Sequence, residues 1–177
     1  MTFVIIAAAV ILVLIGIIAR QPPDFRITRT TTVSAPPAAV FGLVNDFHNW
    51  TAWDPWEKID PALKRTYEGP SEGTGAIYSW VGNIKAGEGR MTILESRRND
   101  LVTIKRELQK PLACANKHEF TFAPEGDHTK VTWSMTGKSN FIFKACSLVM
   151  NMDKAVGEDF EKGLAEIRSL AEAANKK

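Results

Sequence analysis

A change in hydrophobic periodicity near residue 150 constrains the fold of this chain most. Between residues 63 and 137, apolar and polar residues alternate in short runs separated by Gly, Pro and Asn. A period of two is typical of β-strands. Over Asp153–Ala174, apolar residues recur every three or four positions with Glu and Lys between them, which predicts one long amphipathic helix. The simplest arrangement is a curved antiparallel sheet wrapped around that helix, because each then buries its apolar face.

The order of predicted elements gives an α+β fold class with about seven strands. A short helix is expected over Pro37–Asp46, because Pro suits the first helical position, and another short helix or turn over Asn49–Trp56. A further apolar helix over Phe141–Met150 leads into the long one. The predicted strands are Phe25–Ser34, Leu63–Glu68, Gly75–Val81, Gly89–Glu95, Leu101–Leu108, Asn116–Phe122 and Thr129–Gly137.

The N-terminal run Phe3–Ala19 contains no charge and no Pro. At about 1.5 Å per residue, its helix is near the lower limit for crossing a bilayer. A buried core helix would normally have a polar face, which this run lacks. A cleaved signal peptide would have a basic start and a small-residue cleavage site, which are also missing. The sequence therefore predicts an uncleaved transmembrane anchor over residues 1–20, with the membrane as a partner.

The residues after this run predict a linker and then one folded domain. Gln21–Asp24 contains two consecutive prolines, which favour a short stiff linker over residues 21–24. The domain is expected over residues 25–177. Arg20, Arg26 and Arg29 follow the apolar run, and the positive-inside rule would place the domain in the cytoplasm. Three arginines make a modest bias, so the single-pass orientation stays open.

Composition and motifs exclude several functions. A net charge of +2 is too small for a nucleic-acid-binding surface. The sequence has no metal-binding, phosphate-binding or dinucleotide-binding motif, so neither a metal nor a cofactor is expected. Cys114 and Cys146 are the only cysteines, and two buried free thiols are favoured over a disulfide. No feature specifies an oligomeric state.

Five stretches of the sequence resemble the START-related helix-grip superfamily (SRPBCC), in its polyketide cyclase/dehydrase-like branch. They are Val33–Phe41, Asn45–Trp56, Tyr67–Gly75, Thr129–Trp133 and Gly157–Leu164. The resemblance covers nearly all of the chain after the linker and implies the helix-grip fold. Members of the superfamily include ligand carriers and cyclases, so it also implies a small hydrophobic ligand as partner.

Strand alternation identifies one face as the wall of a possible pocket, because side chains two positions apart share a face. The opposite face carries mainly Lys, Glu, Thr and Ser. The alternative is a dry core packed against the C-terminal helix. The residues expected to line a ligand-binding pocket are Tyr78, Trp80, Met91, Ile93, Val102, Ile104, Arg106, His118, Phe120 and Trp133.

Arg106 and His118 are the polar members of this set. A buried charge without a partner is unfavourable by several kcal/mol, so a bound carboxylate, a hydroxyl or an internal carboxylate would satisfy them. The alternative is that both lie at strand ends and reach solvent. Trp50, Trp53 and Trp56 recur every three positions, which favours core packing over a role facing the membrane or at the mouth of a pocket.

His48 is interpreted as a surface histidine. The acidic residues Asp54, Glu57 and Asp60 are interpreted as a solvated loop.

Two functions remain open from the sequence. The favoured one is a membrane-tethered domain that binds a small hydrophobic or lipid-like molecule in an internal cavity, with no catalytic residue assigned. The alternative is a cyclase or dehydratase in which His118 and Arg106 act as acid–base and oxyanion-stabilising groups. A third interpretation is a docking domain whose pocket has lost its role.

Overall fold

A seven-stranded antiparallel sheet forms the body of the protein in a computed structural model that describes residues 2–139 and 141–176. The strand order is β1-β7-β6-β5-β4-β3-β2, so β2 to β7 form a meander of consecutive strands and β1 pairs with β7. The predicted α+β class and all of the predicted strands are therefore confirmed. The strands are β1 (Asp24–Val33), β2 (Lys64–Glu68), β3 (Ile77–Val81), β4 (Glu88–Arg97), β5 (Leu101–Lys110), β6 (Cys114–Glu125) and β7 (His128–Lys138).

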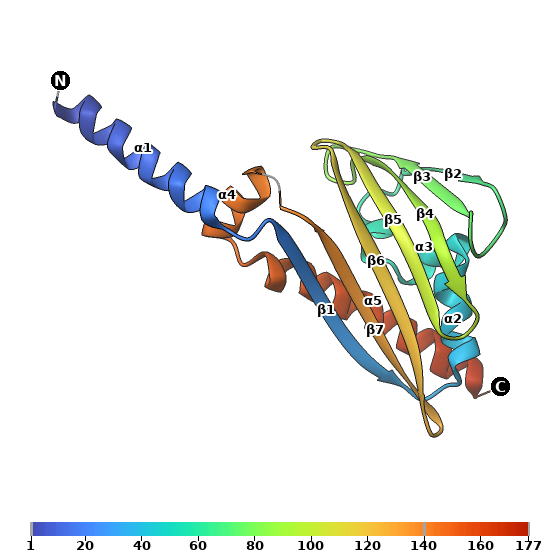
Figure 1. Ribbon diagram of the computed structural model, residues 1–177. Helices are drawn as coiled ribbons and strands as arrows, with labels where there is room; N and C mark the ends of the chain where they lie inside the picture. The colour runs from blue at the N-terminus through green and yellow to red at the C-terminus, as the bar shows by residue number, and fades with distance from the viewer. Residues whose placement is uncertain (1, 140, 177) are drawn as a thin grey trace.

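One long helix, α5 (Met152–Asn175), runs along the sheet as predicted (Figure 1). The short segments that follow β1 are α2 (Pro37–Asn45), the 3₁₀ turn η1 (Phe47–Asn49), α3 (Trp50–Trp53) and the 3₁₀ turn η2 (Pro55–Lys58). The long helix contacts β1 and β7 together with α2, α3 and η2. Pro37 occupies the start of α2, where its missing N–H costs no hydrogen bond.

The core lies between the sheet and α5. The α5 side chains of Phe160, Leu164 and Ile167 are buried, at the helical spacing that the sequence predicted. On β7, Val131 and Trp133 are buried and face them. Burial of each such side chain contributes about 1.5–3 kcal/mol, so this helix–sheet contact is a major part of the stability.

The N-terminal helix α1 (Thr2–Arg20) extends away from the sheet and contacts α4 (Phe141–Val149) near its C-terminal end (Figure 1). Its 19 residues rise about 28 Å. The last turn carries Arg20, so the apolar part is shorter than a hydrocarbon core of about 30 Å. Within the described part of the chain, no helix combines the length and apolarity needed to span a bilayer. The predicted transmembrane anchor and single-pass localisation are therefore wrong, and the membrane partner has no support.

The two cysteines differ in part from the expectation. Cys114 and Cys146 are both free, as predicted. Both are exposed rather than buried. Cys114 begins β6, and Cys146 lies on α4, so neither belongs to the core between the sheet and α5.

Candidate ligand-binding site

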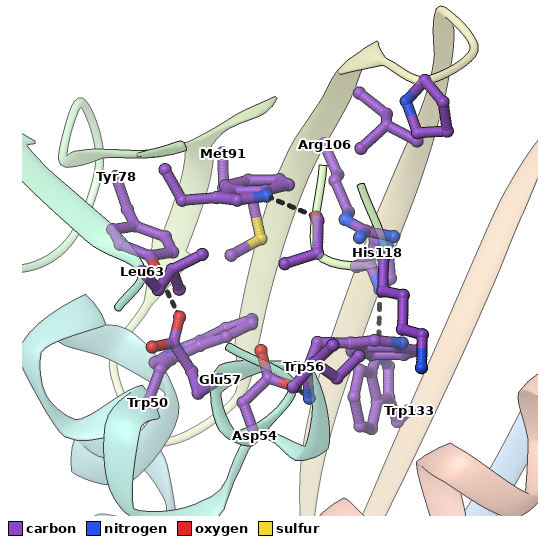
Figure 2. Close-up of a pocket in the computed structure, with 16 residues that line it drawn as sticks. Trp50, Asp54, Trp56, Glu57, Leu63, Tyr78, Met91, Arg106, His118 and Trp133 are labelled. Atoms are coloured by element: carbon purple, nitrogen blue, oxygen red, sulfur yellow. Dashed lines mark hydrogen bonds between the residues drawn. The ribbon is translucent and has the colours of Figure 1, made fainter. Parts of the chain in front are cut away.

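A cavity of about 140 Å³ lies between the 50–63 segment and the inner face of the sheet (Figure 2). Its walls come from α3, η2, strands β3 to β7 and the loops at the same end of the sheet. An apolar cavity of about 150 Å³ holds one benzene molecule, so this one has room for about one ring.

The predicted pocket residues divide into two groups. Six of them line the cavity: Tyr78, Trp80, Met91, Arg106, His118 and Trp133. The other four are buried in the core away from it: Ile93, Val102, Ile104 and Phe120. The alternation of apolar and polar residues identified the inner face of the sheet, but it could not show where along each strand the cavity lies. Since α2 covers part of β5 and β6, the inner face there is filled by packing.

Sequence reasoning missed the residues that the short helices and loops contribute. These are Trp50, Asp54, Trp56, Glu57, Ile59, Leu63, Lys85, Ala86, Leu108 and Pro111. Trp50, Trp53 and Trp56 divide between core packing and lining the cavity. Trp50 and Trp53 are buried core residues as expected, and Trp56 is half-buried. Trp50 and Trp56 also line the cavity. His48 is exposed, as predicted.

The interpretation of Asp54, Glu57 and Asp60 as a solvated loop is wrong. Their exposed fractions are only 3%, 8% and 7%. The physical reason is that each carboxylate accepts hydrogen bonds from nearby backbone N–H groups or side chains. The signal that pointed this way was Asp54-Pro55-Trp56-Glu57, which has the Asp-x-x-Glu spacing of a helix N-terminus.

Asp60 and Glu57 are fully engaged. Asp60 accepts hydrogen bonds from the backbone N–H of Ala62 at 2.9 Å and of Asn83 at 2.7 Å, which fixes the β3–β4 loop beside the cavity. Glu57 accepts one hydrogen bond from the Tyr78 hydroxyl and forms an ion pair with Arg65 at 2.6 Å. Burial and then this hydrogen bond raise the pKa of Tyr78, so its phenol stays protonated.

Asp54 differs because its carboxyl has no ion-pair partner among the described residues. One oxygen accepts a hydrogen bond from the Trp56 N–H at 3.1 Å and caps η2. Burial raises the pKa of Asp54 to about 7, although the Trp56 N–H and the charge of Arg106 act in the opposite direction. This carboxyl therefore changes protonation state near neutral pH.

The Arg106 guanidinium lies between two indole rings. Its central carbon is 5.3 Å from the centre of the Trp56 ring and 5.4 Å from that of Trp80. The Trp80 ring is placed by its N–H, which donates to the Ala86 carbonyl at 3.1 Å. Gly89 makes room for it, since a Cβ there would come within 2.4 Å of the ring.

No hydrogen bond or ion pair reaches the Arg106 guanidinium from any residue that the structure describes. Burial lowers its pKa, and the charge of Asp54 acts against that change. Cation–π contacts with two rings stabilise the charge by about 0.5–2 kcal/mol each, and they leave the N–H donors uncommitted. Arg106 therefore keeps its donors available to a molecule in the cavity.

His118 is held as a neutral donor. Its Nδ1 is 3.0 Å from the Trp133 indole nitrogen, which can only donate. Nδ1 must accept, so the proton of the neutral ring is on Nε2. Burial and the charge of Arg106 lower the pKa of His118 to about 3. Nε2 is buried and has no hydrogen-bond partner within the described part of the chain.

The alternative that both polar residues reach solvent is wrong for His118, because its exposed fraction is 2%. Arg106 is half-buried, so that alternative holds in part for it. Ile104 is the direct partner of His118 on β5, and Arg106 lies two residues further along the same face. Arg106 and His118 therefore present donors from adjacent strands on one side of an aromatic cavity (Figure 2). This arrangement suits the oxygen atom of an otherwise apolar molecule. The described residues contain no cluster of His, Cys, Asp or Glu that could hold a metal ion.

Comparison with solved structures supports the same fold. The di-domain ARO/CYC BexL from the BE-7585A biosynthetic pathway has a TM-score of 0.61 at 16% identity, covering 89% of this chain and 53% of BexL. The Aha1 dimer from Colwellia psychrerythraea gives 0.60 at 11% identity, covering 84% and 96%. Major latex-like protein 151 from Panax ginseng gives 0.57 at 15% identity, covering 87% and 99%.

At such low identity these similarities establish the fold alone. A search of curated proteins finds no match. A family model described as "Polyketide cyclase / dehydrase and lipid transport" matches residues 24–172, which contain the whole sheet and most of α5. The chain therefore belongs to the polyketide cyclase/dehydrase and lipid transport family.

Proposed function

We propose that this protein binds a small hydrophobic molecule that carries an oxygen acceptor. The apolar part of the molecule lies among Trp50, Trp56 and Met91, and its oxygen accepts hydrogen bonds from Arg106 and His118. One observation carries the proposal: the buried Nε2–H of His118 and the half-buried guanidinium of Arg106 face the same aromatic cavity, and neither has a hydrogen-bond or ion-pair partner among the described residues. The family also supports it, because its description names polyketide cyclase/dehydrase and lipid transport.

The buried and unpaired Nε2–H of His118 favours a bound oxygen over an empty pocket. An unsatisfied buried polar group costs about 1–3 kcal/mol. A ligand oxygen at His118 would remove this penalty, and the same oxygen could accept from the nearby Arg106. A purely apolar ligand of the same shape would leave it in place.

Acetophenone and ethylbenzene test this proposal, because they have similar shapes and only the first has a carbonyl oxygen. In calorimetric titrations of the full chain, acetophenone is expected to bind about tenfold or more tighter than ethylbenzene, since a hydrogen bond to a charged group contributes about 1.5–3 kcal/mol. Arg106→Met should remove most of the difference. Ile93→Val is the control, because Ile93 is buried outside the cavity. Equal affinities for the two probes, or no binding of either, would contradict the proposal.

A second candidate function is a reaction through an enolate, of the cyclase or dehydratase kind. Asp54 favours it, because a carboxyl with a pKa of about 7 suits proton transfer near neutral pH. In this proposal Asp54 replaces His118 as the acid–base group, since His118 is neutral with a pKa of about 3. The Asp54 carboxylate would take a proton from the carbon beside a carbonyl, and Arg106 and His118 would stabilise the resulting oxyanion.

Deuterium exchange into acetophenone tests this second function. Asp54 would remove a proton from the methyl carbon, and a deuteron from D₂O would replace it. Proton NMR of the full chain with acetophenone is expected to show methyl exchange above the buffer rate, lost in Asp54→Asn. Exchange at the buffer rate, with acetophenone bound, would leave binding as the function.

A further inference from the structure

We infer that the ligand of this cavity is an anion: a compact carboxylate, about one ring in size, held by the Arg106 guanidinium and the His118 Nε2–H. This inference rests on the proposed function and specifies its ligand class. An anion differs from a neutral ketone or a hydrocarbon because it needs a positive charge in the site, and the guanidinium of Arg106 has no ion-pair partner among the described residues.

The charges that line the cavity leave such a positive charge. Lys85 at the rim and Arg106 inside are the cationic lining residues, and Asp54 and Glu57 are the acidic ones. Glu57 is neutralised by its ion pair with Arg65. The raised pKa of Asp54 supports the same conclusion, because the protonated carboxyl carries no charge that could neutralise Arg106. An anion is then the group that completes the site.

The shape of the Arg106 environment favours a carboxylate among anions. Trp56 and Trp80 interact with the guanidinium through their rings, so its N–H groups are left for a ligand. A planar guanidinium matches a carboxylate with two parallel hydrogen bonds. The Nε2–H of His118, from the neighbouring strand, supplies a further donor.

The size of the cavity limits the rest of the ligand. About 140 Å³ corresponds to roughly one benzene ring. Trp50, Trp56, Leu63 and Met91 provide the apolar wall for such a ring. Long-chain or multi-ring molecules would have to displace these side chains, whereas benzoate would not.

Benzoate and benzamide form the matched pair for the test. They have the same ring and nearly the same planar shape, and they differ in charge. At pH 6, calorimetric titration of the full chain is expected to show benzoate binding at least tenfold tighter than benzamide. Arg106→Met should abolish this preference, and Arg106→Lys should retain part of it, because Lys keeps the charge without the planar fork. Binding of ethylbenzene by each variant shows that its cavity is still formed.

A second arm varies pH. Asp54 is faced by Arg106 from β5, Glu57 from η2 and Asp159 from α5, with His118 and Lys85 also lining the cavity. When Asp54 ionises it competes for Arg106, so benzoate affinity should fall several-fold between pH 6 and pH 8. Benzamide affinity should change little, and Asp54→Asn should remove the dependence for benzoate.

The outcomes separate this inference from the function on which it rests. Benzamide binding as tightly as benzoate, or unchanged benzoate affinity in Arg106→Met, would overturn the proposal that the ligand is an anion. If acetophenone still binds more tightly than ethylbenzene, the oxygen-binding function stands without it. If no probe binds, both are overturned.

Discussion

Replacing Asp54 with Asn is expected to stabilise the folded chain by about 3 kcal/mol at pH 8 and by almost nothing at pH 4. Burial raises the pKa of Asp54 from 3.8 to about 7, so the folded state holds the charged carboxylate only at a cost. Each pKa unit is worth about 1.4 kcal/mol, which gives about 4 kcal/mol for this change. Asn keeps an oxygen for the Trp56 N–H, and small repacking losses reduce the expected gain.

The sign follows from proton binding. Between about pH 4 and 7 the unfolded chain has lost the Asp54 proton and the folded chain retains it, so stability falls as pH rises through this window. His118 acts oppositely, since its pKa falls from 6.5 to about 3 on folding. The two contributions cancel in the wild type between about pH 4 and 6.5. In Asp54→Asn only the His118 contribution remains, and stability should rise with pH over that interval.

Urea unfolding of the full chain from pH 4 to pH 8 checks this prediction. Asp127→Asn is the control, because Asp127 is exposed in the β6–β7 turn and its replacement should change stability little at any pH. A gain for Asp54→Asn that is equal at pH 4 and pH 8 would show that Asp54 is not held neutral by burial. A loss of stability at pH 8 would show the same.

Replacing Trp133 with Ala is expected to destabilise the chain by about 3–5 kcal/mol. Trp133 is fully buried and stacks on Phe160 of α5 with ring centres 3.9 Å apart. Its indole N–H also donates to His118, so the residue links the helix, the sheet and the cavity. Its removal would leave a large void at this junction.

Trp133→Phe separates packing from the hydrogen bond. Phe can retain the stack on Phe160, but it leaves Nδ1 of His118 without its donor, at an expected cost of about 1–3 kcal/mol. Urea unfolding of both variants provides the measurement, with Ile93→Val as a reference for a one-methyl core change of about 0.5–1.5 kcal/mol. An Ala variant no less stable than the Phe variant would contradict the role assigned to this junction.

The fold was predictable because periodicity reports which face of an element is buried. Strand alternation and the helical spacing of Phe160, Leu164 and Ile167 are local properties of the chain, and packing of the sheet on α5 satisfied both. The same reasoning failed for α1. An uninterrupted apolar run predicted a membrane span, but the helix that it forms ends at Arg20 after 19 residues.

The site was only half predictable, for a related physical reason. Alternation placed Arg106 and His118 on the inner face, but it could not show that α2 covers part of β5 and β6 while Arg106 and His118 remain beside a void. Asp54 was missed because an acidic residue before Pro is usually solvated. The charges that act on it include Arg106 of β5 and Asp159 of α5, which are distant in sequence.

The most direct test of the oxygen-binding site is ¹⁵N NMR of the His118 side chain in the full chain at pH 6, with and without acetophenone. The structure predicts a neutral imidazole with its proton on Nε2, and a change in the Nε2 resonance when acetophenone saturates the cavity. The exposed His128 serves as an internal reference that should not respond. A charged ring, a proton on Nδ1, or an Nε2 resonance unchanged by bound acetophenone would contradict the assignment of Arg106 and His118 as the ligand's partners.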